Sequence, residues 1–284
     1  MSLRYIDTHV HFWDRSILPY GGLEPFEAIS TPHTPATYQT ETAVAPPEKI
    51  VFLQCVGDID RWRDEVNWIE SLAAADPRLA GIVATAPLDQ GDHTLHVLDA
   101  LATRPLVKGI RHNTQDGPRG HAYRHAYVAG AHAAGQRGLS VDLCCLHPQL
   151  PDLTALAAHC PQTSFILDHL GKPGIRDHLI DQWHHDIDQL ARQPNVTAKL
   201  SGIVTEADPA TWTTNDLRPY VARYLEVFGA QRIGFGSAWP VVKLASTHAQ
   251  WLTTARTLLA PLSAEDQHQI FFANAERIYR LAPN

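Results

Sequence analysis

Two histidines one residue apart are the first residues of the chain that could do chemistry. His9 and His11 belong to the sequence D-T-H-V-H at residues 7–11, which closes an apolar run at residues 3–6 that predicts a buried strand. Alternate side chains of a strand share a face, so both imidazoles are expected to point the same way. They could hold a metal ion or polarise a substrate carbonyl directly, although a bare pair with this spacing is more often structural. The rest of the chain must decide between these interpretations.

Cationic and imidazole side chains recur where other apolar runs end. Arg111 and His112 follow one such run, His169 follows another, and Lys199 ends a third. A guanidinium such as that of Arg111 can clamp a carboxylate or a carbonyl oxygen, and the ammonium of Lys199 could stabilise a developing oxyanion. A structural ion pair with a neighbour such as Asp168 explains Lys199 equally well.

The elements that must position these side chains alternate along the chain. Apolar runs predict strands at residues 3–6, 50–55, 79–84, 107–111, 139–144, 164–168, 196–200 and 232–236. Helices are predicted around residues 62–72, 95–101, 127–134, 153–159, 180–192, 219–228 and 251–258. Ser263 and Asp266 form a capping box that opens a last helix. The Pro- and Thr-rich residues 19–47 predict a long active-site loop with one short helix.

Eight strands, each followed by a helical stretch, predict a single-domain α/β fold, a (β/α)8 TIM barrel that spans residues 1–284. A doubly wound open sheet is the competing fold. It would normally carry a glycine-rich phosphate loop after its first strand, where this chain has D-T-H-V-H.

Catalytic side chains of such a barrel lie at the carboxyl ends of its strands, and this rule filters the 17 histidines of the chain. His9, His11, His112 and His169 lie just beyond predicted strands, and His147 is a weaker candidate. Other histidines fall in helices or loops and are predicted to be solvated bystanders: His93, His96, His132, His159, His178, His184, His185, His248 and His268.

Composition and charge narrow the range of partners. The chain is 44% hydrophobic and 19% charged, which is ordinary for a globular protein. A formal net charge of -7 argues against nucleic acid or an anionic membrane as a partner, and no apolar run is long enough to span a bilayer. The start of the chain lacks the apolar segment of a secretion signal, and the cysteines lack zinc-type spacing. We therefore expect a cytoplasmic protein with reduced cysteines that acts on a small molecule; a homo-oligomer is compatible with these data.

The motifs of the chain, taken together, resemble those of a known family. D-T-H-V-H-F-W at the start of the chain resembles the opening motif of the amidohydrolase superfamily. Further segments resemble motifs of the amidohydrolase-related lactonases, which include fuconolactone, rhamnonolactone, sulfomuconolactone and pyrone-dicarboxylate lactonases. These segments are K-G-I-R-H (Lys108–His112), L-D-H-L-G-K-P (Leu167–Pro173), K-L-S-G (Lys199–Gly202), G-S-A-W-P-V (Gly236–Val241) and N-A-E-R-I-Y-R-L (Asn274–Leu281). The resemblance implies a (β/α)8 barrel that hydrolyses a small cyclic lactone, with His9, His11 and His169 polarising the carbonyl.

One position departs from the family pattern. The family's eighth strand ends in G-S-D-W-P, in which the aspartate is the general base that activates water, and this chain has Ala238 there. A methyl group cannot accept a proton, and loss of a general base costs on the order of 10² to 10⁴ in rate. Because Ser237, Trp239 and Pro240 keep the family pattern, a single deliberate substitution is favoured over a natural alteration. We expect the form with Ala238 to be catalytically impaired.

The metal content stays open at this stage. His9, His11 and His169 could provide the three protein ligands of a catalytic zinc site. Superfamily members that bind metal tightly usually add a histidine after the fifth strand and the eighth-strand aspartate, whereas this chain has Cys144, Cys145 and later Ala238. Some lactonases of the family work without a metal. The expectation is no obligatory cofactor, with one divalent ion such as zinc as the alternative.

The sequence favours a carboxylic-ester hydrolase of carbohydrate metabolism that opens a sugar aldonolactone such as fuconolactone or rhamnonolactone. Arg111 is the only arginine at the end of a predicted strand, whereas a dicarboxylate would require several. The flat faces of Trp13 and Trp239 suit a sugar ring, although packing under a loop explains them equally well. His112 and Lys199 complete the expected substrate-binding set. The alternatives are a metal-dependent decarboxylase of the same superfamily and a non-catalytic sugar-acid-binding relative.

Overall fold

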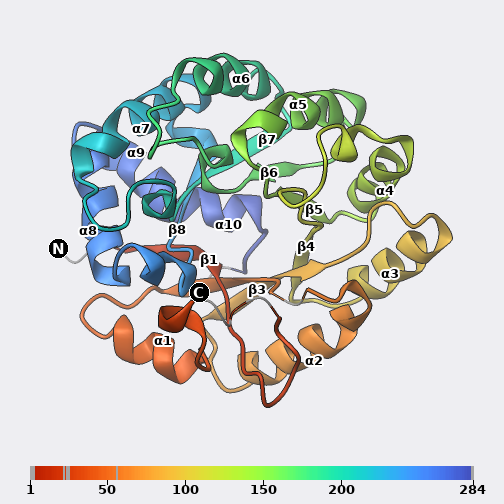
Figure 1. Ribbon diagram of the computed structural model, residues 1–284. Coiled ribbons are helices and arrows are strands. Elements are labelled where there is room, and N and C mark those ends of the chain that lie inside the picture. The colour runs from red at the N-terminus through yellow and green to blue at the C-terminus, as the bar shows by residue number, and fades with distance from the viewer. Residues whose placement is uncertain (1–3, 22, 24–25, 56, 283–284) are drawn as a thin grey trace.

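Eight parallel strands form one sheet in this computed structural model, which describes residues 4–21, 23, 26–55 and 57–282 (Figure 1). They pair in chain order: β1 (Ile6–Val10), β2 (Lys49–Leu53), β3 (Leu79–Thr85), β4 (Val107–Arg111), β5 (Ser140–Leu143), β6 (Phe165–Leu167), β7 (Val196–Ser201) and β8 (Ile233–Gly236). The ends of the last seven differ from the predicted ends by at most two residues. The first strand begins at Ile6, and Leu3, part of the predicted strand, lies outside the described residues.

Polar contacts close the sheet between β1 and β8. The His11 N–H donates to the Trp239 carbonyl at 2.8 Å, and the Ser237 N–H donates to the buried Asp7 carboxylate at 2.7 Å. The first and last strands therefore meet, as the (β/α)8 prediction requires and an open sheet would not allow. The prediction of a barrel is confirmed.

Helices surround the strands as an outer ring, except that the last one lies across the middle of the barrel in the view of Figure 1. They are α1 (Pro35–Glu41), α2 (Trp62–Ala73), α3 (Asp92–Ala102), α4 (His125–Gln136), α5 (Leu150–His159), α6 (Asp181–Ala191), α7 (Thr214–Phe228), α8 (His248–Leu259), α9 (Ala264–His268) and α10 (Asn274–Ile278). The short α1 lies within the predicted long loop, as expected. Among the described residues, no helix combines the length and apolar character needed to cross a membrane.

Two helices differ from their predicted form. α7 starts five residues before the predicted position 219, because Thr213 caps it: its N–H donates to the Asp216 carboxylate at 2.7 Å. The last predicted helix consists of α9, a π-helical turn at Gln269–Ala273 and α10. Its predicted cap is confirmed, since the Ser263 hydroxyl accepts the Asp266 N–H at 3.1 Å.

The C-terminal segment closes the barrel at the amino ends of the strands. Ile6, Val51 and Ile166 form one buried cluster with Phe272 and Tyr279. The cluster lies away from the strand ends that carry the predicted site, because Ile6 is the first residue of β1. The terminal motif therefore seals the floor of the barrel.

One histidine predicted to be solvated is buried. His248, the first residue of α8, is 2% exposed, and its Nε2 lies 3.5 Å from Asp7 Oδ2. It lies three residues before Trp251 and seven before Ala255, so it shares their buried helix face. The prediction was wrong at this position because the apolar stripe of α8 extends back to a polar residue.

Close packing of α4 gives a direct test of the fold. A methyl group on Gly130 would lie 2.1 Å from the Leu88 carbonyl oxygen. We expect Gly130→Ala to lower the free energy of unfolding by about 1–3 kcal/mol, the usual cost of overpacking. Denaturant unfolding measures the change. Gly57→Ala is the control, because a methyl there meets no described atom within 4 Å; equal effects at the two positions would contradict the packing.

Candidate active site

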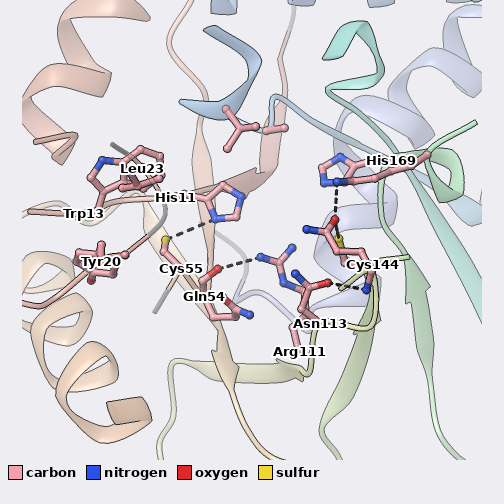
Figure 2. Close-up of a pocket in the computed structure, with 15 residues that line it drawn as sticks. His11, Trp13, Tyr20, Leu23, Gln54, Cys55, Arg111, Asn113, Cys144 and His169 are labelled. Carbon is pink, nitrogen blue, oxygen red and sulfur yellow. Dashed lines mark hydrogen bonds between the residues drawn. The ribbon is translucent and has the colours of Figure 1, made fainter. Parts of the chain in front are cut away.

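A cavity of about 240 Å³ opens at the carboxyl ends of the strands. Figure 2 shows Trp13 and Tyr20 on one side of it and Arg111 and Asn113 on another. Its described lining residues are His11, Trp13, Tyr20, Gly21, Leu23, Gln54, Cys55, Arg111, Asn113, Gln115, Cys144, His169, Lys172, Ala238 and Val241. Five residues singled out in the sequence are therefore in its wall: His11, Trp13, Arg111, His169 and Ala238.

The three predicted catalytic imidazoles lie together at this end of the barrel, but only His11 and His169 line the cavity, and His9 is fully buried. The ring centroid of His9 lies 4.9 Å from that of His11 and 4.3 Å from that of His169. The Nδ1 atoms of His11 and His169 each lie 3.0 Å from a backbone carbonyl oxygen, on β2 and β7 respectively. The Nδ1 atom of His9 lies 3.3 Å from Asp168 Oδ1. Every ring is thus held by an oxygen atom at Nδ1.

These contacts favour one tautomer of each ring. A carbonyl or carboxylate oxygen only accepts, so these contacts favour the tautomer with the proton on Nδ1 and the lone pair on Nε2. The Ser201 hydroxyl, 2.9 Å from His169 Nδ1, can also accept that proton. Burial lowers the pKa of His11 and of His169 to about 3 and holds the pKa of His9 well below its ordinary value, so the rings are neutral near pH 7. The Nε2 atom of His9 is buried and has no hydrogen-bond partner among the described residues. The set offers neutral nitrogen lone pairs to a ligand.

Ala238 lies beside this set. A Cβ added to Gly202 would lie 2.5 Å from the Ala238 Cβ and 3.7 Å from His169 Nδ1, so residue 202 has to be glycine where these groups approach. The backbone of Ala238 is left-handed, with φ 58°. Alanine is disfavoured in that conformation, whereas aspartate and asparagine adopt it more readily. The backbone therefore suits the aspartate that the family motif has here.

Asp168 connects the imidazoles to a buried set of charges. Arg111 donates to Asp168 Oδ2 at 3.1 Å, and Lys199 Nζ lies 3.0 Å from Oδ1. Lys199 also contacts Asp142 Oδ2 at 2.5 Å. Burial alone would raise the pKa of Asp168, but the Lys199 charge and the contact with His9 hold that pKa well below its usual range. The carboxylate is therefore ionised, with Arg111 donating to Oδ2 and with Lys199 and His9 close to Oδ1.

Three predicted substrate-binding residues lie outside the cavity lining. Lys199 is 1% exposed and lies between two carboxylates. Trp239 is fully buried, and its indole N–H donates to the Glu41 carboxylate at 2.8 Å. His112 accepts the Leu88 N–H at 3.1 Å through Nδ1 and lines a neighbouring hollow. A position near the end of a strand does not determine whether a side chain points into the cavity or into the protein core. The geometry therefore does not support direct substrate contact by Lys199, Trp239 or His112.

Several lining residues were not predicted. Gln54 directly follows β2, and Asn113 and Gln115 follow β4, so the strand-end rule could have found them. Lys172 donates to Gln115 Oε1 at 2.6 Å, while Asn113 Oδ1 accepts the Gln115 N–H at 3.1 Å. Tyr20 comes from the long loop after β1, where no sequence pattern marks individual residues.

The residues present fit one divalent ion. Donor atoms of His9, Asp168 and His169 lie within 4.8 Å of one another. Asp168 already contacts two cations, so the two imidazoles of this group are the better donors. His11 is not a member of the group, although its ring centroid lies 4.9 Å from that of His9. Their Nδ1 contacts are the outer interactions that usually orient metal-binding histidines.

A second group of similar composition does not fit a metal. Asp89, His112 and His121 also place donor atoms within 4.8 Å of one another. The Leu88 N–H donates to His112 Nδ1, so the neutral ring carries its proton on Nε2 and has no lone pair left for an ion. His147, the weaker candidate, is half-buried and lines yet another hollow.

Comparison with known proteins places this geometry in a family. Residues 6–281 match the sequence family described as Amidohydrolase. The chain belongs to this amidohydrolase family. The match confirms the resemblance that the motifs indicated and covers the whole barrel.

Two proteins named L-fucono-1,5-lactonase, from Burkholderia ambifaria and Burkholderia multivorans, are 28% and 30% identical to this chain. The alignments cover 97% and 99% of this chain and 95% and 97% of theirs. Crystal structures of an amidohydrolase from Burkholderia multivorans, one with bound HEPES and one with bound zinc, align with TM-scores of 0.88 and 0.87 at 27% identity. Both alignments cover 99% of this chain and 100% of the other. These relatives support lactone hydrolysis as the general reaction.

Proposed function

We propose that this amidohydrolase opens a small sugar lactone and that its Ala238 form is impaired. The observation that carries the proposal is the place of Ala238, in the cavity wall and beside His169. A carboxylate at this position would hold a water molecule and take its proton as the water attacks the lactone carbonyl. The reaction breaks the ring ester bond and leaves a hydroxy acid. The names of the two lactonase relatives support an aldonolactone as the substrate.

The lining suits a single polyhydroxyl ring. The amide groups of Gln54, Asn113 and Gln115 can both donate to and accept from hydroxyl groups, and Trp13 offers a flat apolar face. Arg111 is the only arginine among the described lining residues, and a buried carboxylate already engages it. A substrate with two carboxylates would want several free cations. The proposal therefore keeps the aldonolactone and sets the dicarboxylate lactones aside.

The tautomers change the role expected for the imidazoles. A lone pair cannot donate a hydrogen bond, so direct polarisation of the carbonyl by His9, His11 and His169 is not supported. We assign these residues as ligands of one divalent ion, which when bound supplies Lewis-acid polarisation of the lactone carbonyl. Arg111 and Lys172 supply N–H donors for other substrate oxygens. This assignment replaces the expectation that no metal is needed.

Metal removal tests the ligand assignment. We expect a chelator to lower the lactonase activity of the Ala238→Asp protein by at least about 10², because several kcal/mol of transition-state stabilisation are lost with the ion. One equivalent of zinc should restore it. Elemental analysis of the protein before and after treatment provides the control. Full activity in protein shown to be metal-free would overturn the ligand assignment and leave the hydrolase proposal in place.

A lactone panel tests the substrate class. We expect the Ala238→Asp protein to release acid from fucono-, rhamnono- or related aldonolactones and not from a pyrone dicarboxylate. Acid release in weakly buffered solution is the measurement. If no lactone is opened, the proposal fails. In that case, CO₂ release from an unsaturated carboxylic acid would favour a decarboxylase, and sugar-acid binding without turnover would favour a binding protein. Action in the cytoplasm, without nucleic acid or membrane partners, remains a prediction.

A further inference from the structure

A buried line of charges lies below the cavity on neighbouring strands. Asp142 belongs to β5, Asp168 follows β6, and Lys199 belongs to β7; these strands are adjacent in the barrel (Figure 1). Lys199 Nζ lies 2.5 Å from Asp142 Oδ2 and 3.0 Å from Asp168 Oδ1. Tyr279, from the segment that closes the barrel floor, donates its hydroxyl to Asp142 Oδ2 at 2.8 Å. With both carboxylates fully buried, none of these groups can reach a substrate.

The line ends on a catalytic imidazole. Asp168 Oδ1 is shared, because it lies 3.0 Å from Lys199 Nζ and 3.3 Å from His9 Nδ1. An ammonium only donates, so Lys199 can act on the ring in two ways: by holding Asp168, or by donating to an unprotonated Nδ1 3.5 Å away. The contact with the carboxylate is shorter and joins opposite charges, so we take it as the stronger of the two. With Lys199 bound to Asp168, the Nδ1 proton of His9 also points toward the Asp168 carboxylate.

We propose that Lys199, held by Asp142 and Tyr279, is a positioning residue that orients Asp168 and thereby keeps the His9 proton on Nδ1. The proposal gives a role to the K-L-S-G motif and to the tyrosine of the terminal motif, which contact no substrate. The charges of Arg111 and Lys199 balance those of Asp142 and Asp168, so no member can be neutralised without leaving another buried and uncompensated. Only the kinetic consequence of this arrangement rests on the proposed function.

The tautomer of His9 is the decisive readout. In full-length protein with ¹⁵N-labelled histidine, freed of metal, we expect the parent to show His9 protonated at Nδ1 alone; His9→Gln identifies its signals. Lys199→Met should shift or broaden these signals as the proton divides between the two nitrogens. Asp142→Asn, which keeps the shape of the side chain, should have the same effect to a smaller degree, and Tyr279→Phe the least. A folded Lys199→Met protein with parental His9 signals would overturn the proposal. If Lys199→Met does not fold, parental signals in Asp142→Asn would do so.

A second buried lysine provides the matched control. Lys49 is 3% exposed and donates to Glu276 at 2.6 Å and to the Ala282 carbonyl at 2.7 Å, at the floor of the barrel. Lys49→Met removes a comparable ion pair without touching His9. We expect it to lower stability and leave the His9 signals unchanged. Equal shifts in both lysine variants would mean that the effect is general loosening, and the proposal would fail.

Kinetics supply an independent reading in the Ala238→Asp background. We expect Lys199→Met and Asp142→Asn to lower kcat by about 10- to 100-fold, the usual cost of losing an outer partner of a functional histidine, with KM within about twofold. Lys49→Met should change neither constant. A change in KM alone would show that Lys199 acts on substrate binding and not on His9. If no lactone is turned over, the proposed function fails while the His9 signals still decide this proposal.

Discussion

Replacing Ala238 with aspartate is expected to raise kcat/KM for an aldonolactone by about 10² to 10⁴, the range that a positioned general base contributes. The carboxylate would enter the cavity wall beside His169, where the attacking water must lose its proton. The backbone at this position is already left-handed, so aspartate should be accommodated without rearrangement. Acid release at several lactone concentrations measures the gain.

A second substitution at position 238 serves as the control for Ala238→Asp. Ala238→Val has no proton acceptor, and its branched side chain is strongly disfavoured at φ 58°. We expect it to lose stability without gaining activity. A valine variant as active as the aspartate variant would show that the gain does not come from proton transfer.

Replacing His169 with asparagine in the Ala238→Asp protein is expected to lower kcat/KM by on the order of 10² to 10³. The change removes one of the three imidazole lone pairs assigned to the metal. His169 has φ 52°, a conformation that asparagine adopts more readily than most residues, so the backbone should be preserved. Steady-state kinetics with metal analysis measures the effect, and bound zinc should fall with activity.

His178→Asn is the matched control for this prediction. His178 has a similar left-handed backbone, with φ 53°, and lies exposed outside the cavity lining. The same chemical change should leave kcat/KM and metal content unaltered. Equal losses at residues 169 and 178 would show that the effect belongs to the backbone and not to the imidazole.

The barrel is predictable from sequence because most of its strands are short apolar runs with sharp ends. V-K-G-I-R at 107–111 coincides with β4. The first strand is displaced because Asp7 and His9 lie inside β1 and not after it, where buried partners compensate them. A polar barrel interior breaks the apolar pattern on which the prediction rests. The start of α7 is hidden for a different reason: Pro219, inside the helix, suggests a helix start five residues too late.

The site is predictable only in part. The strand-end rule finds His11, Arg111 and His169, because parallel strands bring their carboxyl ends to one rim. It cannot tell that Lys199 and Trp239 point into protein, because that depends on local strand register and on loop packing. The strand-end rule also cannot predict the histidine tautomers, because these depend on which atoms lie next to each ring nitrogen.

Asp142 is a site residue that charge balance could indicate from the sequence. It is a carboxylate within the apolar run of β5, and a buried charge requires a partner. Lys199, the lysine within the predicted seventh strand, is that partner in the structure. Charge balance requires a cationic partner for Asp142, but the choice of Lys199 over Lys108 of the predicted fourth strand, and the link to His9, required the structure.

The most direct test of the central claim compares two variants at position 238. Ala238→Asp and Ala238→Asn have side chains of nearly equal size, both suit a left-handed backbone, and only the carboxylate can take a proton from water. Their rates of aldonolactone opening should be measured side by side in zinc-loaded protein at neutral pH. We expect the aspartate variant to be faster by at least about 10². Equal rates, or no hydrolysis by either variant, would contradict it.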